Sequence, residues 1–353
     1  MRLRYQDFLE EKKDLIGLLL DSFDIKYKYI NKYKKGFVDV YDICPVFGTK
    51  ISKLNGLLDE LGMYLRSFDA PSGYVVPSEG VYRVEIQTEP IVSKELEDLF
   101  CLDIGDKVIP TCIGTTSSGL DLFIDLNCIP NLLIGGTTGS GKSVLLHNII
   151  LSQINFGSDL YLVDPKYVEF SMYKNFLGVS KIDNSVEEFK ITLLELFEKM
   201  NYRYNLMKKF KARNIKEYNN NINVKNKFSP IVIVIDEWAD LCLQDKKLQD
   251  NLCLIAQKGR AAGISIVLAT QRPSVNVISG LIKANFPGRI CLRVASSVDS
   301  KVIIDTAGGE TLTETGCGLY LDGSLKKPVK FKTPYISNID IFLRGLKWKL
   351  LTR

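Results

Sequence analysis

The stretch Asn131-Leu-Leu-Ile-Gly-Gly-Thr-Thr-Gly-Ser-Gly-Lys-Ser143 decides the fold of this chain. Its first residues are apolar and predict a buried strand, and the residues that follow it, Val144–Leu151, predict a helix. Between strand and helix lies the pattern G-x-x-x-x-G-K-S, in the strand–loop–helix order that gives this pattern its meaning. We therefore predict a loop that binds nucleotide phosphates.

The residue types in this loop suit a bound triphosphate. Glycines allow backbone N–H groups to close around phosphate oxygens, and the N-terminus of a helix favours an anion. Lys142 can reach the β- and γ-phosphates, and the Ser143 hydroxyl can ligate Mg²⁺. The residues expected to bind ATP and Mg²⁺ are Gly136, Thr137, Thr138, Gly139, Ser140, Gly141, Lys142 and Ser143.

A second apolar run, Pro230–Ile235, ends in the carboxylates of Asp236 and Glu237. We expect this strand to lie beside the phosphate-loop strand, where Asp236 would hold Mg²⁺ together with Ser143. Glu237 would polarise a water for attack on the γ-phosphate. Two acids at a strand end can also be simple caps, but their combination with the phosphate loop favours ATP hydrolysis.

Two further polar positions are catalytic candidates. Ile266–Gln271 predicts a third strand, and Gln271 at its end is suited to sense the γ-phosphate, with a polar strand cap as the alternative. Arg260 is expected on the helix after the two acids, and an arginine can stabilise transition-state charge from a neighbouring subunit. The alternative for Arg260 is a surface residue without a catalytic role.

Hydrophobic patterns indicate a small domain followed by a larger α/β domain. The chain has 353 residues, of which 46% are hydrophobic and 25% charged, enough for one large or two ordinary domains. Residues 1–24 predict an amphipathic helix, residues 25–100 a small α+β domain, and residues 101–353 alternating strands and helices around a mostly parallel sheet. The other expected elements are strands near 25–30, 36–43, 74–76, 82–86, 160–163 and 290–294, a hairpin over 108–124, helices over 51–65 and 186–211, and an exposed loop over 214–227.

Charge and cysteine content restrict the class of protein only loosely. The net charge of +5 permits a nucleic-acid partner without requiring one. The Lys- and Tyr-rich run Lys26–Lys35 is a candidate nucleic-acid face, but an edge strand protected by lysines explains it better. The eight cysteines include no C-x-x-C pair and predict reduced thiols. The apolar run Leu15–Leu20 is far shorter than the roughly 20 residues of a membrane span, so we expect a cytoplasmic protein that reaches a membrane only through a partner.

These motifs resemble, in order, those of the FtsK/SpoIIIE family of DNA translocases. The matching stretches are Gly135–Ser143, Val163–Lys166 with Glu169, Val234–Leu241, Ala256–Gly263, Leu268–Val275, Ile278–Pro287 and Ser296–Ser300. They fall within roughly residues 100–325, and a weaker similarity covers roughly 30–100. The resemblance implies a RecA-like P-loop ATPase that assembles as a hexameric ring and pumps double-stranded DNA.

The resemblance also implies roles for basic residues. Arg260 matches an arginine that acts on the nucleotide of a neighbouring subunit in related coupling ATPases. Arg272 and Lys283 match loop residues that face DNA in the channel of the ring.

In the loop after Lys283 the family usually has a lysine and then an arginine, where this chain has Ser297 and Lys301. We include Lys301 among the DNA-binding candidates. One positive charge is missing, and phosphate contacts dominate nonspecific DNA affinity. We therefore expect weaker or more salt-sensitive DNA binding than in a chromosome motor, with Arg289 or Arg293 as candidates to compensate.

Neither a membrane-spanning N-terminal region nor a winged-helix module is recognised, which favours the shorter relatives carried by conjugative elements, plasmids or phages. We predict an ATP-dependent translocase of double-stranded DNA that serves a mobile element. The first alternative is a coupling protein that moves single-stranded DNA with a relaxase to a membrane secretion channel. A protein-secretion ATPase is disfavoured by the single phosphate loop, and a nonenzymatic DNA-binding subunit by the set Lys142, Asp236 and Glu237.

Overall fold

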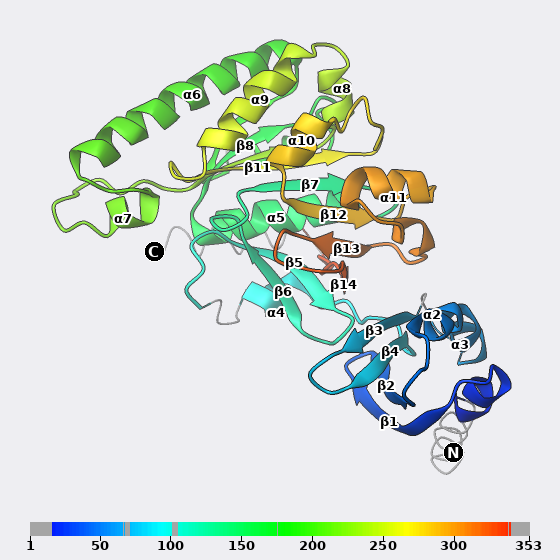
Figure 1. Cartoon of the computed structure of the whole chain (residues 1–353). Coiled ribbons are helices and arrows are strands. Elements are labelled where there is room, and N and C mark those ends of the chain that lie inside the picture. Colours follow the sequence, from blue (N-terminus) through cyan, green and yellow to red (C-terminus); the bar gives the residue numbers. More distant parts are fainter. Residues whose placement is uncertain are drawn as a thin grey trace. The chain divides into compact units, whose positions relative to one another are not determined.

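The computed structural model describes residues 16–65, 67, 71–100, 105–174, 176–337 and 339, which form two compact units (Figure 1). The first unit extends to Val92 and includes the hairpin tip Thr116–Leu120. The second comprises Ser93–Thr115 and the chain from Asp121 onward. This division falls at Val92 and not at residue 100.

The first unit is built on a four-stranded antiparallel sheet in the order β1-β2-β4-β3. Its elements are β1 (Tyr27–Lys35), β2 (Val38–Pro45), α2 (Ile51–Gly56), α3 (Leu58–Tyr64), β3 (Ser72–Val76) and β4 (Val81–Gln87). The Lys- and Tyr-rich strand β1 lies at the edge of the sheet, as the edge-strand interpretation predicts. The predicted helix over 51–65 is divided at Leu57, directly after Gly56, because glycine weakens a helix.

The helix predicted for residues 1–24 lies partly outside the described residues. Residues 16–22 are helical, and Ile16 and Leu20 are fully buried in the core of the first unit. The apolar face of this helical segment therefore packs on the first unit itself, together with the inner face of β2 and β4.

The second unit contains a ten-stranded sheet in the order β6-β5-β14-β13-β12-β7-β11-β10-β8-β9. From β12 to β9, neighbouring strands pair in parallel. The pairs β12 with β13, β13 with β14, and β5 with β6 are antiparallel. The strands are β5 (Pro110–Thr116), β6 (Asp121–Asp125), β7 (Asn131–Gly135), β8 (Asp159–Val163), β9 (Val179–Asp183), β10 (Ile231–Ile235), β11 (Ile264–Thr270), β12 (Gly288–Leu292), β13 (Cys317–Leu321) and β14 (Val329–Lys332).

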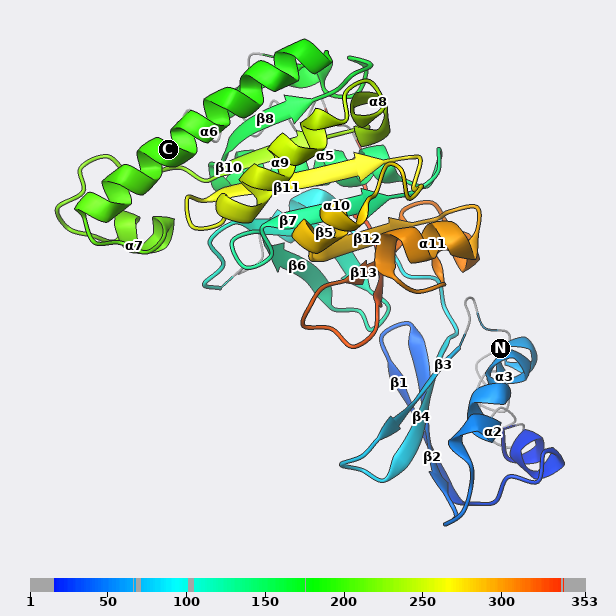
Figure 2. The ribbon, with the colours of Figure 1, turned by 45° about the horizontal axis from the view of Figure 1, so that its top comes forward.

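Helices cover both faces of this sheet, which is why its central strands are mostly apolar (Figures 1 and 2). One face carries α4 (Leu96–Phe100) and α5 (Lys142–Phe156). The other face carries α6 (Val186–Lys209), α8 (Trp238–Cys242), α9 (Lys247–Lys258), α10 (Gly280–Asn285) and α11 (Ser297–Ile304). In β10, Ile231, Ile233 and Ile235 face the second group, whereas Val232 and Val234 face α5.

The structure corrects two predictions about this unit. Strand β10 does not lie beside β7, because β11 pairs with both and separates them. These strands are all fully buried and mostly apolar, so their sequences do not distinguish their order. The predicted loop over 214–227 contains α7 (Ile215–Asn219), whose Tyr218 is buried and stacks on Phe228 with 4.4 Å between ring centroids. The pattern analysis also missed β9, β13 and β14.

Candidate active site

The phosphate loop runs from Gly136 to Gly141, between the end of β7 and the start of α5. Gly139 and Gly141 have φ angles of +75° and +99°, which L side chains rarely adopt. A Cβ atom added to Gly141 would lie 2.7 Å from the backbone nitrogen of Gly316. Backbone conformation and close packing thus both require glycine at this position.

Two segments from the antiparallel side of the sheet hold the loop. The backbone N–H and Oγ1 of Thr137 donate to the carbonyl of Arg293, at 2.9 and 3.0 Å. The Arg293 guanidinium donates to the carbonyls of Gly139 (3.2 Å) and Thr313 (3.0 Å). The Gly316 N–H donates to the Ser140 carbonyl at 2.9 Å. Arg293 is therefore engaged in supporting the phosphate loop, and its compensation for a lost DNA contact stays a prediction.

Lys142 and Asp236 meet in the buried centre of the site. The Lys142 amine donates to the Asp236 backbone carbonyl at 2.9 Å and forms an ion pair with the Asp236 carboxylate. Only 4% of Lys142 and 3% of Asp236 is exposed. Although β11 separates β7 from β10, the first residue of α5 thus still lies against the acid at the end of β10.

Ser143 contacts an acid to which the sequence analysis gave no role. Its hydroxyl donates to Glu169 Oε1 at 2.9 Å, and Glu169 Oε2 lies 3.5 Å from Nε2 of His147. Burial lowers the pKa of His147 and outweighs the opposing effect of Glu169. The sequence did offer a signal for Glu169. It follows β8, and the carboxyl end of β8 lies on the same side of the sheet as the phosphate loop.

Glu237 and Gln271 are connected through the end of β11. The Glu237 carboxylate accepts from Thr270 Oγ1 at 2.6 Å and from the Gln271 backbone N–H at 2.9 Å. The Gln271 side-chain oxygen in turn accepts from Thr138 Oγ1 of the phosphate loop at 2.8 Å. Glu237 is 2% exposed, so its charge is satisfied by these donors and by the start of α8.

This arrangement fits ATP with Mg²⁺. The loop offers left-handed glycines, a helix N-terminus and the Lys142 cation to a phosphate chain. The Ser140 hydroxyl is buried at the loop and has no hydrogen-bond partner among the described residues, so a donor is available for a phosphate oxygen. The Ser143 hydroxyl and the Asp236 carboxylate are oxygen ligands of the kind Mg²⁺ prefers, and the metal would supply neutralisation of phosphate charge.

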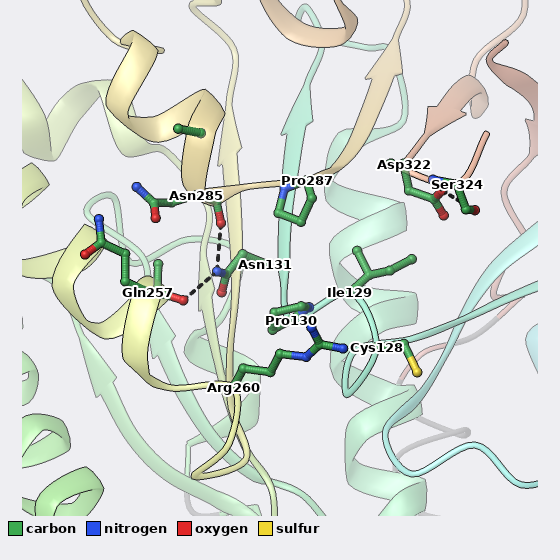
Figure 3. A pocket seen from close by; sticks show the side chains of 13 residues that line it. Cys128, Ile129, Pro130, Asn131, Gln257, Arg260, Asn285, Pro287, Asp322 and Ser324 are labelled. Atoms are coloured by element: carbon green, nitrogen blue, oxygen red, sulfur yellow. Dashed lines mark hydrogen bonds between the residues drawn. The ribbon is translucent and has the colours of Figure 1, made fainter. Parts of the chain in front are cut away.

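Arg260 lines a pocket together with residues at the start of β7 (Figure 3). It is exposed after α9, and its Nε donates to the carbonyl of Asn127 at 3.3 Å. With Asn131, the first residue of β7, it lines a pocket of about 680 Å³. Strand β7 ends at Gly135, four residues after Asn131, and the phosphate loop begins directly beyond that end. A strand advances about 3.3 Å per residue. Arg260 and the phosphate loop therefore lie at opposite edges of the sheet.

The structure brings two of the three DNA-binding candidates together. The Lys283 amine on α10 donates to the carbonyl of Lys301 on α11 at 3.2 Å. It also lies 2.5 Å from the Asp305 carboxylate, with which Arg289 pairs as well. Partial burial opposes ionisation of Asp305, but hydrogen bonds from Lys283 and Arg289 outweigh it and lower its pKa. Arg289 therefore shares Asp305 with Lys283, and its compensation for a missing DNA contact stays a prediction.

The third candidate, Arg272, is exposed and directly follows Gln271 at the end of β11. The Arg272 backbone N–H donates to Thr270 Oγ1 at 3.1 Å, and Glu237 accepts a hydrogen bond from the same hydroxyl. The backbone position of Arg272 therefore depends on the contact between Thr270 and Glu237. Among the helices that the structure describes, none has the length and apolar character needed to cross a membrane.

A glycine-rich loop between a parallel strand and a helix, with a buried lysine against an acid at the end of a nearby parallel strand, defines a P-loop ATPase domain. Residues 106–275 match the model of the FtsK/SpoIIIE family. The chain belongs to this family.

Individual relatives agree with this assignment. The chain is 32% identical over 347 residues to DNA translocase SftA of Bacillus subtilis (strain 168), a match over 95% of this chain and 36% of SftA. It is 35% identical over 343 residues to DNA translocase FtsK of Leptospira interrogans, over 92% of this chain and 36% of that protein. The chain thus spans little more than a third of the length of these relatives.

Among solved structures, the fold is similar to the monomer form of the pCW3 conjugation coupling protein TcpA with ATPγS. The TM-score is 0.69 at 26% identity, and the match covers 93% of each chain. This similarity includes the small first unit as well as the ATPase domain, because so little of either chain remains unmatched.

Proposed function

We propose that this chain is an ATP-driven DNA translocase that works as a ring of identical subunits, with six as the expected number. The observation that carries the proposal is the direct connection between the ATP site and a basic residue beyond it. Thr138 of the phosphate loop contacts Gln271, the Gln271 N–H is held by Glu237, and the exposed Arg272 comes next in the chain.

In this proposal each site residue has a role in hydrolysis. Lys142 binds the β- and γ-phosphate oxygens, and Ser143 with Asp236 holds Mg²⁺. Glu237 orients the attacking water and accepts its proton, and Gln271 responds to the γ-phosphate. The change in Gln271 then moves Arg272, and the Lys283–Lys301 pair provides a second contact with the DNA backbone.

Arg260 acts in the neighbouring subunit. Because it lies at the opposite edge of the sheet from its own phosphate loop, it suits the nucleotide of a neighbour that packs against this edge. A ring of subunits in one orientation places every such edge against the next phosphate loop. The arginine would there stabilise the charge that develops on the transferred phosphoryl group.

We favour double-stranded DNA as substrate, because the most similar relatives described above are DNA translocases. The similarity to a conjugation coupling protein supports a setting in the transfer or maintenance of a mobile element. A coupling protein that moves single-stranded DNA remains the second candidate on the same observation. The proposal includes a location in the cytoplasm. It also includes recruitment of the chain by a relaxase or by a membrane channel.

The steady-state ATPase rate, titrated with double-stranded and with single-stranded DNA at low salt, tests the proposal. Lys142→Arg is the matched control, because it keeps a cation beside the buried Asp236, whose carboxylate would otherwise lose its partner at a cost of about 3–5 kcal/mol. We expect strong stimulation by the duplex and little turnover in the control. Stimulation by single strands alone would favour the coupling protein, and no response to either DNA would refute a DNA motor.

A further inference from the structure

The loop after β8 places Glu169 beside the phosphate loop. A buried aspartate holds the backbone of this loop after β8. Asp164 is fully buried, and its carboxylate accepts from the backbone N–H groups of Lys166 (3.2 Å) and Phe170 (2.9 Å). Tyr167 within the same loop has a left-handed φ of +53°. Such a backbone persists only where its surroundings hold it, so the position of Glu169 is determined by the fold.

Glu169 and Glu237 face different parts of the site. The Glu237 carboxylate accepts from Thr270 and from the Gln271 backbone, on the β11 side. Glu169 directs Oε1 to the hydroxyl of Ser143 at 2.9 Å, and its other oxygen lies 3.5 Å from the His147 ring. Its side chain remains 35% exposed, so it is open to solvent beside the phosphate loop.

We propose that Glu169 is a positioning residue for the divalent cation of the ATP site. This inference rests on the proposed function of that site. Glu169 orients the Ser143 hydroxyl and adds a negative charge next to the oxygen that would ligate the metal. Groups that orient metal ligands in this way commonly change metal affinity about 10–100-fold when they are replaced.

The same charge has opposite effects on the two components of Mg²⁺-ATP. It attracts the cation and repels the phosphates. Removing it should therefore weaken Mg²⁺-dependent binding while leaving metal-free nucleotide binding unchanged or tighter. A residue that merely supports the loop would lower both affinities together.

The test is equilibrium binding of mant-AMPPNP, a fluorescent and non-hydrolysable ATP analogue, to the whole chain in EDTA and along a Mg²⁺ titration. For Glu169→Gln we expect the Mg²⁺ concentration at half-maximal binding to rise at least tenfold, with no loss of affinity in EDTA. Glu169→Asp keeps the charge and should stay closer to wild type than Glu169→Gln. Glu198→Gln, an exposed acid on α6, controls for the charge change itself.

Equal weakening with and without Mg²⁺, or an unchanged Mg²⁺ titration, would overturn the role of Glu169. Glu169→Ala permits the same comparison if the glutamine variant does not fold, as judged by its melting temperature. If the wild-type chain bound the analogue neither with Mg²⁺ nor in EDTA, both this inference and the proposed ATP site would fall. Equal binding under both conditions would refute the inference about Glu169 and leave the nucleotide site standing. A normal wild-type response with an unchanged variant would remove only Glu169.

Discussion

Asp305 pairs with Lys283, which we place on the DNA path, and with the nearby Arg289, so removing its charge should strengthen DNA binding. Its carboxylate lies 2.5 Å from the Lys283 amine and also pairs with Arg289. Asp305→Asn keeps the size of the side chain and leaves both cations without an acidic partner. Because its side chain is 58% exposed, loss of the pairs should change the free energy of unfolding by no more than about 1 kcal/mol.

The expected gain follows from counterion release. Each additional phosphate contact steepens the dependence of log K on log salt by about 0.9. Between 50 and 200 mM salt, one extra contact by Lys283 therefore multiplies the loss of affinity by about 3.5. Contacts by both Lys283 and Arg289 would together multiply it by about 12. In the Asp305→Asn background, Lys283→Ala should remove the steepening of about 0.9 that the released Lys283 contributes.

Fluorescence anisotropy of a labelled duplex, measured along a salt titration, reads both affinity and slope. The matched control is Asp250→Asn, which removes the same charge from an exposed position on α9. We expect tighter binding at low salt and a steeper slope for Asp305→Asn than for the control. If both variants gave the same slope, or Asp305→Asn bound more weakly than wild type, Lys283 would not lie on the DNA path.

Three further experiments test the glycine conformations, the role of Arg260 and the burial of a cysteine. Chemical denaturation should show a loss of about 1–2 kcal/mol for Gly157→Ala, where φ is +79° and no described atom lies within 4 Å of the added Cβ, but about 2–5 kcal/mol for Gly141→Ala, where the Cβ would meet backbone at 2.7 Å. Equal losses would contradict that close contact. Arg260→Ala subunits mixed into wild-type rings should lower the ATPase rate more than in proportion to their fraction, whereas a linear decline would exclude action on a neighbour. Burial raises the pKa of Cys242 to about 11, so a maleimide at neutral pH should modify the exposed Cys128 and spare Cys242; mass spectrometry showing early loss of the Cys242 thiol would contradict its burial.

The parts of the site that local pattern determines were predictable. A phosphate loop needs consecutive glycines between a strand and a helix, so residues 136–143 reveal both its place and its chemistry. Apolar runs that end in polar residues likewise identified the strands before Asp236 and Gln271. The long helix α6 followed from its spacing of apolar residues.

The missed features depend on neighbours that are distant in sequence. No local pattern shows that β11 separates β7 from β10, because strand order depends on which buried strands pair in the folded sheet. The support of the phosphate loop by Arg293 requires the loop after β12 to lie beside β7. Strands β13 and β14 have mixed burial, so their patterns lack the strong alternation of a half-buried strand.

The strand that separates the two expected neighbours also determines how far a signal must travel. Thr270 and Gln271 at its end contact Glu237 on one side and Thr138 on the other, and Arg272 is the next residue. A displacement of Arg272 by a few tenths of an ångström would already lengthen hydrogen bonds on both sides. In the proposed motor, a single peptide unit therefore separates the residue that contacts the phosphate loop from the residue that contacts DNA, so a pull on the DNA would act directly on the ATP site.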